Sequence, residues 1–521
     1  MYRRNCMKQK SLSKFLVAML TLSMVSACSP KTNTDMAKDT IHITLSDEEI
    51  LVNGEKISTD SNEAVYVGEP IIYYEEGKDA SYGEGEAQDA HSQEEADLHT
   101  VVTITKSGEY TVSGSLSHGQ IHVDLGEDAK KDPEAVVTLT LDSVDITNTV
   151  APAILVMNVY ECGDDEDPTM EVDTSKAGFH LVLADEKVNT LNGAYVAKIY
   201  KEGTTSKLHK YDGAISSKRS MTISGNGKLE VNAENEGISS NMHLSVNGGY
   251  IEINSHDDAV NTSEDNVSVF EMNAGTLICN SGLGSEGDGI DSNGWIVING
   301  GNLVASANGM SMDSGLDADL GIYTNGGTVV STGHMYDAIE ADSKQMFGVF
   351  NFSGTRDGQE LLTLIDSKNE TVASFASIND YSILVFSSDV LEEGDHTLYG
   401  MTQLGHISGM HGNMGMRPNG NMQFDPNQMP QDFQPGTMPE GFDPQQGRPN
   451  MGNFDPNQLP EGFNGEINGF DLNNMPGFDP NMIPQGGMPG SMPNMNAGEL
   501  STVFTFSGIM NTFFGITEVS E

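Results

Sequence analysis

One short pattern repeats along this chain, and the repeat restricts the fold more than any other feature. A small residue precedes an apolar anchor, a polar residue follows, and an alternating β-run ends at a glycine corner, as in DGIDSNGWIVINGG. Steps of 23, 22, 30, 26 and 23 residues separate the anchors, which are Ile215, Ile238, Val260, Ile290, Leu316 and Ile339. Repeats of this length, made of strands without a helical period, are typical of stacked-repeat folds. The sequence therefore predicts an all-β fold, a right-handed parallel β-helix with three short strands per coil.

Acidic residues recur at fixed places in these repeats. Side chains alternate along a strand, so Ile290 should face the core and Asp291 should face solvent. Successive coils would then stack Asp291, Asp317 and Glu340 about 4.8 Å apart. The candidate metal ligands in this row, in the row two residues further on and in the loops entering the same strands are Asp288, Asp291, Asp313, Asp317, Asp319, Asp337, Glu340 and Asp342.

Stacked carboxylates repel one another unless something neutralises them. Calcium takes six to eight oxygen ligands at roughly 2.3–2.6 Å, so two carboxylates about 5 Å apart can share one ion. The acids recur in register instead of being scattered, which favours Ca2+ as the cofactor. The alternative is a solvated acidic face without an ion, in keeping with a very acidic chain.

The N-terminus has the features of a secretion signal. Arg3, Arg4 and three lysines precede the apolar run 15–25, which is too short for a permanent membrane helix. The sequence Val-Ser-Ala-Cys that follows resembles a bacterial lipobox, in which Cys28 carries the lipid. We expect a protein anchored by lipid to the extracellular face of a bacterial cell membrane. Ordinary secretion with an incidental cysteine is the alternative.

The net charge of −50 limits the partners. Such an acidic chain is not expected to bind nucleic acid or to be attracted electrostatically to anionic lipid. If the ligand is itself a polyanion, a cation must bridge the two.

Changes in composition divide the chain into five parts. After about residue 355 the pattern becomes one of hairpins, and a tract rich in Met, Pro, Gly and Asn interrupts it before the last strands. The predicted parts are a signal peptide (1–27), a lipid-anchored tether (28–40), a parallel β-helix (41–355), a small antiparallel β-module (356–405 and 499–519) and a disordered insert (406–498).

Two sets of polar and aromatic residues in the repeats have different predicted roles. Asn recurs before glycine at one corner and can hydrogen bond to its stacked copies, in an asparagine ladder; these residues are Asn247, Asn273, Asn299 and Asn325. Asn293 and Ser263 point outward and could bond sugar hydroxyls. Trp295, the only tryptophan, should be partly exposed, either as a sugar-stacking surface or as a packing lid under a loop.

The chain resembles a family of bacterial secreted or lipid-anchored carbohydrate-binding β-helix proteins, related in fold to pectate lyases of polysaccharide lyase family 9. The resemblance covers roughly 41–404 plus the final strands, and rests on the repeated corner pattern, the GDGIDSNG segment at 287–294 and the lipoprotein leader. It implies a calcium-binding protein that attaches to acidic plant polysaccharides such as pectin, and to cellulose, without established catalysis. The calcium ligands would fall on the in-register acids.

Two other functions remain open at this stage. A lyase needs a basic residue beside its calcium to remove a proton, and Lys218 is the outward-facing candidate. Lys218 lies three coils from Asp291, roughly 14 Å at strand spacing, which is too far for one metal-assisted proton transfer. A structural surface adhesin is the third reading.

Overall fold

The computed structural model describes residues 40–164, 166–401, 466–467, 470–471 and 501–516. The predicted signal peptide, nearly all of the tether with Cys28, and most of the predicted insert lie outside these residues. Within the insert, the structure describes the short hairpin of β32 (Glu466–Ile467) and β33 (Phe470–Asp471). No helix among the described residues is long and apolar enough to cross a membrane.

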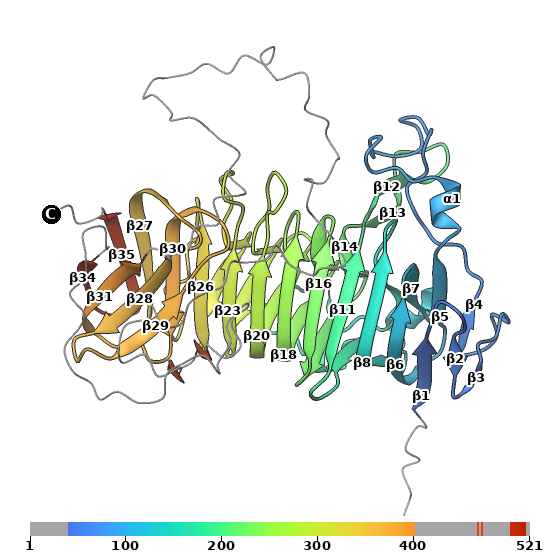
Figure 1. Cartoon of the computed structure of the whole chain (residues 1–521), viewed down its shortest axis with the longest axis horizontal. Helices are drawn as coiled ribbons and strands as arrows, with labels where there is room; N and C mark the ends of the chain where they lie inside the picture. Colours follow the sequence, from blue (N-terminus) through green and yellow to red (C-terminus); the bar gives the residue numbers. More distant parts are fainter. Residues whose placement is uncertain (1–39, 165, 402–465, 468–469, 472–500, 517–521) are drawn as a thin grey trace, which may run out of the picture. The chain divides into compact units, whose positions relative to one another are not determined.

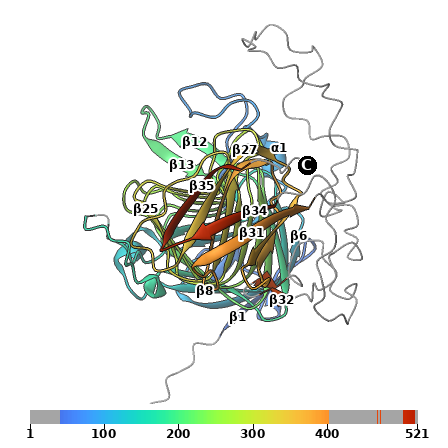
Figure 2. The ribbon, with the colours of Figure 1, turned by 90° about the vertical axis from the view of Figure 1, so that its left-hand side faces the viewer.

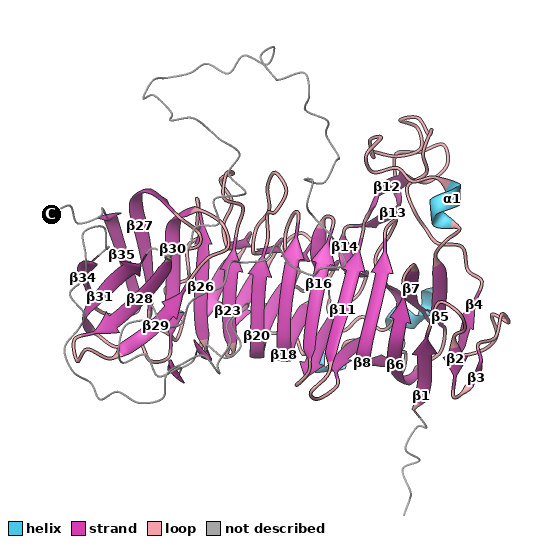
Figure 3. Ribbon diagram, in the orientation of Figure 1, coloured by secondary structure: helices cyan, strands magenta, loops and turns pink. Residues whose placement is uncertain are grey.

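Nearly all regular structure is β-strand, as Figure 3 shows. The largest sheet contains β1 (Ile41–Leu45), β2 (Leu51–Val52), β3 (Glu55–Lys56), β6 (Gly108–Leu116), β8 (Val137–Asn148), β10 (Phe179–Leu183), β11 (Val188–Gly193), β15 (Met221–Gly225), β16 (Lys228–Ala233), β18 (Leu244–Ser255), β20 (Val269–Asn280), β22 (Trp295–Ile298), β23 (Asn302–Ser306), β25 (Gly321–Thr324), β26 (Thr328–Gly333), β27 (Phe347–Arg356), β30 (Tyr381–Ser388) and β35 (Met510–Ile516). Figure 1 shows β8, β11, β16, β18 and β20 side by side in this sheet.

A second sheet has nine strands, and its order places the repeats next to one another. Its members are β4 (Val65–Val67), β5 (Thr100–Ile104), β7 (Gly119–Asp124), β9 (Ile154–Asn158), β14 (Gly213–Ser217), β17 (Glu236–Ser240), β19 (Val260–Thr262), β21 (Ile290–Ser292) and β24 (Leu316–Ala318). From β5 to β24 every pairing is parallel. The apolar anchors Ile215, Ile238 and Val260 of this sheet are at most 1% exposed, in a hydrophobic core shared with the largest sheet.

The all-β prediction is confirmed, but the prediction of a right-handed parallel β-helix with three short strands per coil is wrong. Parallel pairings run from β8 through β10, β15, β18, β16 and β11 and return to β8, which closes a six-strand parallel β-barrel with extra strands. The closure arises because β18 does not end at Asn247-Gly248-Gly249. With Gly249 at φ +87°, the corner becomes a bend inside one 12-residue strand.

The C-terminal strands are mainly antiparallel. A four-stranded sheet holds β28 (Leu361–Asp366), β29 (Thr371–Phe375), β31 (Gly394–Met401) and β34 (Ser501–Phe506). β34 pairs antiparallel with β31, and β35 pairs parallel with β27, as Figure 2 shows from that side. Phe350, Phe375 and Phe506 pack in the core of this region.

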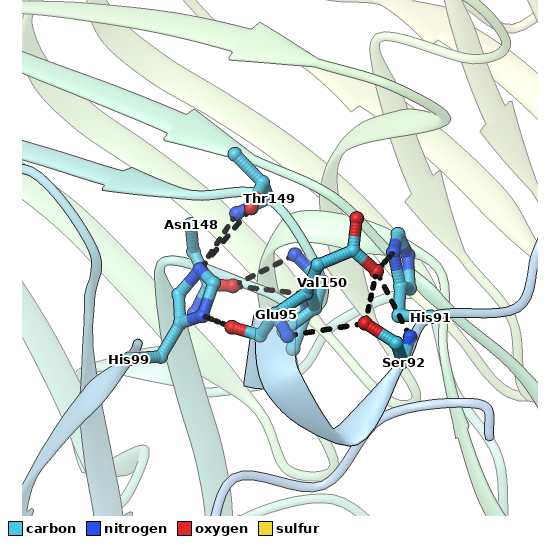
Figure 4. A network of polar contacts seen from close by, with 8 residues as sticks. His91, Ser92, Glu95, His99, Asn148, Thr149 and Val150 are labelled. Carbon is cyan, nitrogen blue, oxygen red and sulfur yellow. Dashed lines mark hydrogen bonds and ion pairs between the residues drawn. The ribbon is translucent and has the colours of Figure 1, made fainter. Parts of the chain in front are cut away.

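Three short helices and one further hairpin complete the fold. They are α1 (Gln93–Ala96), η1 (Glu127–Lys131), η2 (Thr174–Lys176) and the hairpin of β12 (Val196–Tyr200) and β13 (Lys207–Tyr211). The four-residue α1 begins with a capping box between Ser92 and Glu95. His99 then links the helix to the turn after β8, because it contacts the Glu95 carbonyl at 3.0 Å and accepts the Thr149 N–H at 3.1 Å (Figure 4).

The predicted asparagine ladder is confirmed. Asn273 donates to Asn247, Asn299 to Asn273 and Asn325 to Asn299, each at 2.9–3.0 Å. A second ladder, which the sequence did not predict, joins Asn192, Asn232, Asn254 and Asn280 at 2.9–3.0 Å. The ladders hold successive repeats in one register.

Substitution at the middle of the first ladder should cost more than substitution at its end. Asn299→Ala removes side-chain bonds to Asn273, Glu271 and Asn325, whereas Asn325→Ala removes one. At about 0.5–1.5 kcal/mol per bond, the loss of three bonds in Asn299→Ala should lower the free energy of unfolding by roughly 1.5–4.5 kcal/mol, and the loss of one in Asn325→Ala by about 0.5–1.5 kcal/mol. Urea denaturation measures both. Equal losses of unfolding free energy in the two variants would show that the hydrogen bonds of the ladder do not determine its contribution to stability.

Candidate functional site

The nine-stranded sheet brings the repeated acids together. Ile238 pairs with Val260, Val260 with Ile290 and Ile290 with Leu316, so the predicted register of these anchors is confirmed. The residues after the anchors are then direct neighbours: Asn261 pairs with Asp291, and Asp291 with Asp317. The predicted stacking of Asp291 on Asp317 is therefore confirmed.

A second acidic row lies two residues before the anchors. Glu236, Asp258 and Asp288 occupy equivalent positions on β17 and at the entrances to β19 and β21. Two of these carboxylates accept hydrogen bonds from the main chain of the next repeat. Asp288 N donates to Asp258 Oδ1 at 2.7 Å, and Ser314 N donates to Asp288 Oδ1 at 2.6 Å. Glu236 and Asp258 are 7% and 8% exposed, so these carboxyl groups are buried.

Asn261 connects the two rows. Its Nδ2 lies 3.2 Å from a carboxylate oxygen of each of Glu236, Asp258 and Asp291. An amide group has only two N–H bonds to donate, so it cannot satisfy three carboxylates fully. The buried oxygens Glu236 Oε2 and Asn261 Oδ1 have no hydrogen-bond partner. We call Glu236, Asp258, Asn261, Asp288, Asp291, Asp317 and Asp337 the acidic site.

Burial and mutual repulsion raise the pKa values of five carboxyl groups of the site. Burial raises the pKa of Asp288 to about 9 and that of Asp258 to about 8, with neighbouring carboxylates adding to both shifts. The pKa of Asp291 rises to about 6, first by burial and then by the charge of Asp319. Burial and a hydrogen bond with Asp337 raise the pKa of Asp317 to about 7. The pKa of Glu236 is raised well above its usual range, by burial and then by Asp212 and Asp258.

Some of the predicted metal ligands lie elsewhere. Glu340 does not stack on Asp317, because Ile339 pairs with Ile322 of β25, and the charges of Glu340 and Asp342 act on Tyr323 instead. The Asp313 carboxylate accepts hydrogen bonds from Gly287 N and the Ser311 hydroxyl.

Two other predicted acids lie beside the acidic site. Asp337 accepts a bond from Ala318 N at 3.0 Å, next to Asp317. Asp319 is exposed, and its charge acts on Asp291.

The predicted sugar-binding residues lie at the other end of β21. Trp295 is half-buried at the start of β22, where it pairs with Val269 and Gly321. Asn293 is half-buried, and its amide donates to Asp265 at 2.7 Å and to the Ser263 carbonyl at 3.4 Å. Lys218 follows β14, three strands from β21 in the sheet order.

Glu236, Asp258 and Asn261 are the members of the site that the sequence analysis missed. The signal was present, because counting two residues back from each anchor reaches Glu236, Asp258 and Asp288 alike. The alternation of apolar and polar residues places the positions two residues before each anchor in a loop. It therefore could not predict that these acids are buried together.

The donor chemistry of the acidic site suits a hard cation. Carboxylate and amide oxygens are the ligands that Ca2+ prefers, and two buried oxygens here are unsatisfied. In the part of the chain that the structure describes, no three His, Cys, Asp or Glu side chains form a ready-made metal site. A bound ion would therefore need side-chain rotation or water oxygens to complete its ligands.

Two comparisons with known proteins give matches with the same description. A family model described as "carbohydrate-binding domain-containing protein" matches residues 99–349, a range that includes the whole acidic site. A protein of the same description from Acetivibrio thermocellus is 36% identical over 153 residues, which is 29% of this chain and 44% of the relative. The match thus spans less than half of that relative's length.

A solved structure, described as the polysaccharide lyase-like protein from C. thermocellum in a gadolinium derivative, is 22% identical with a TM-score of 0.34. The alignment covers 58% of this chain and 95% of that one. The coarser part of the predicted resemblance, to carbohydrate-binding proteins, is supported by the family model and the relative.

Proposed function

We propose that this protein binds polysaccharide, and that a calcium ion in the acidic site takes part in the binding. The observation that carries the proposal is the cluster of buried, in-register carboxyl groups with two unsatisfied oxygens inside the range matched by the carbohydrate-binding model. A purely structural role does not explain why several carboxyl groups are buried at the cost of pKa values raised to about 6–9.

The residues of the site have separate roles in this proposal. Glu236, Asp258 and Asp291 supply negative charge, and Asn261 can turn its unsatisfied Oδ1 toward a cation. When bound, the ion would supply a positive centre with open coordination positions for a uronate carboxylate. Because the pKa values of these carboxyl groups are raised, binding of the ion must release the protons that they carry.

The finer proposals follow from the charge and the leader sequence. With a net charge of −50, the chain repels an anionic polymer, and a bound cation would reduce this repulsion. An acidic plant polysaccharide such as polygalacturonate is the ligand we propose, with cellulose as a further candidate. Asn293, Ser263 and Trp295 would contact sugar hydroxyls and rings. We propose attachment to the extracellular face of a bacterial membrane by lipid at Cys28.

One observation favours a lyase as a second candidate. Burial lowers the pKa of Lys218, and the charges of Lys207 and Arg219 lower it further, as a lysine general base requires. Lys218 is nevertheless three strands from Asp291, about 14 Å at strand spacing. Release of unsaturated uronates, followed by ultraviolet absorbance and abolished in Lys218→Ala, would establish the lyase.

A glycan array with saturating calcium and with EDTA tests the proposed function. We expect retention on acidic plant polysaccharides that is strongest with calcium. Absence of retention on every polysaccharide in both conditions would reject the function.

A further inference from the structure

The hairpin β12–β13 leads directly into β14 of the nine-stranded sheet, and Figure 1 shows the hairpin next to this strand. Four basic residues lie on this hairpin and directly after β14. Only Asp212 separates the end of β13 from the start of β14. Lys201 and Lys207 stand at the tip of the hairpin, where Lys201 N donates to Ser206 O at 2.8 Å. Lys218 and Arg219 directly follow β14. We call Lys201, Lys207, Lys218 and Arg219 the basic group.

None of these four side chains has an acidic partner within ion-pair distance among the described residues. Single lysines elsewhere in the described part of the chain, such as Lys106 and Lys344, also have no ion pair, but here the charges of Lys201, Lys207 and Arg219 all act on Lys218. Such a concentration of cations stands out in a chain with 76 acidic and 26 basic residues. Nearby lysines on the same hairpin are paired: Lys198 with Glu84 at 2.8 Å and Lys210 with Asp212 at 2.9 Å. The basic group is therefore a local exception to the charge of the chain.

The surroundings of Lys218 and Arg219 do not neutralise their charges. The Arg219 Nε is buried and has no hydrogen-bond partner. Lys218 is half-buried, with its Nζ 5.3 Å from the centre of the Tyr211 ring. The carboxylate of Asp124 acts on Lys218, but it already accepts bonds from Gly126 N at 2.8 Å and Asn158 Nδ2 at 2.9 Å.

We propose that Lys201, Lys207, Lys218 and Arg219 form an anion subsite that binds a carboxylate of an acidic polysaccharide directly, without a metal ion. The inference rests on the proposed function and specifies its substrate class as uronate-containing. A guanidinium can bind a carboxylate through two parallel hydrogen bonds, and the lysines add point charges around it. β14, which Lys218 follows, is next to β17, which carries Glu236 of the acidic site. The strand register places Lys218 at the same strand ends as Asn293, so a polymer that crosses these strands can contact the subsite and the acidic site.

The test is isothermal titration of soluble polygalacturonate into the full chain in EDTA. The variant is Lys218→Gln with Arg219→Gln, and the control is Lys106→Gln with Lys344→Gln, which removes the same charge at two exposed lysines outside the basic group. We expect the variant to bind about tenfold or more weakly, since charge-assisted bonds are lost. The control should stay within about twofold of the wild type. Added salt should weaken the wild type more than the variant.

A second variant covers the case in which half-buried Lys218 is needed for folding. Lys207 is exposed at the start of β13, and Lys207→Gln should weaken binding in EDTA about threefold without a change in melting temperature. Equal affinities of the wild type and both variants in EDTA would overturn the subsite. Retention of cellulose only, or of polygalacturonate only with calcium, would overturn the subsite and leave polysaccharide binding intact. Binding of no polysaccharide at all would reject both.

Discussion

In EDTA, raising the pH from 7 to 8.5 should lower the melting temperature by about 5 °C. Asp258 and Asp288 have folded-state pKa values of about 8 and 9, well above the usual 3.8. In this window the folded state holds protons that the unfolded chain has lost, so stability falls as the pH rises through these values. Saturating calcium should remove most of the fall, because the ion replaces the protons.

The window is chosen to separate the acids from the histidines. Burial lowers the pKa of several histidines, that of His243 to about 4, so their contribution is lost only as the pH falls below the unfolded value of 6.5. Above pH 7 they remain neutral in both states. Asp288→Asn should flatten the dependence measured by differential scanning calorimetry. A melting temperature that stays level or rises from pH 7 to 8.5 in EDTA would contradict the pKa assignment.

Glu236→Gln should abolish most of the stabilisation by calcium while leaving the calcium-free protein intact. The carboxamide has the shape of the protonated carboxyl group, so the melting temperature in EDTA should not fall. Calcium at about 100 times its Kd adds roughly 2.7 kcal/mol to the free energy of unfolding of the wild type. In Glu236→Gln the rise in melting temperature should shrink to less than half, because the buried oxygen without a partner is the ligand that is lost.

Glu264→Gln is the matched control for this substitution. Glu264 is exposed in the loop after β19, and its replacement is the same Glu→Gln change and removes the same formal charge. The control should keep the full calcium response in thermal melts and in retention on polygalacturonate. A full response in Glu236→Gln, or an equal loss in both variants, would show that calcium acts elsewhere or through net charge alone.

The sequence predicted those parts of the fold that depend on local alternation. The all-β class and the register of the anchors from Ile215 to Leu316 follow from residues that alternate and recur, and the structure confirms both. The closure of the barrel could not be predicted in this way. Whether Asn-Gly-Gly ends a strand or bends it depends on the pairing of β18 with β16 and β20, which lie on either side of it.

The same difference between repeated positions and contacts across strands explains which residues of the acidic site could be predicted. Asp291 and Asp317 were predictable because their positions repeat, whereas the contact of Asn261 with three carboxylates depends on side-chain directions across neighbouring strands. The predicted stacking of Glu340 on Asp317 was wrong, because the parallel pairing of the repeats stops before Glu340. β26 pairs antiparallel with β30, and Ile339 pairs with Ile322 of β25 instead of with Leu316 of β24.

The central claim is that a cation in the acidic site strengthens the binding of an acidic polysaccharide. Its most direct test is the affinity of the full chain for polygalacturonate, measured by isothermal titration in saturating calcium and in EDTA. We predict an affinity about tenfold or more higher in calcium, with the difference lost in Glu236→Gln and kept in Glu264→Gln. The same affinity in calcium and in EDTA for the wild type would contradict the claim.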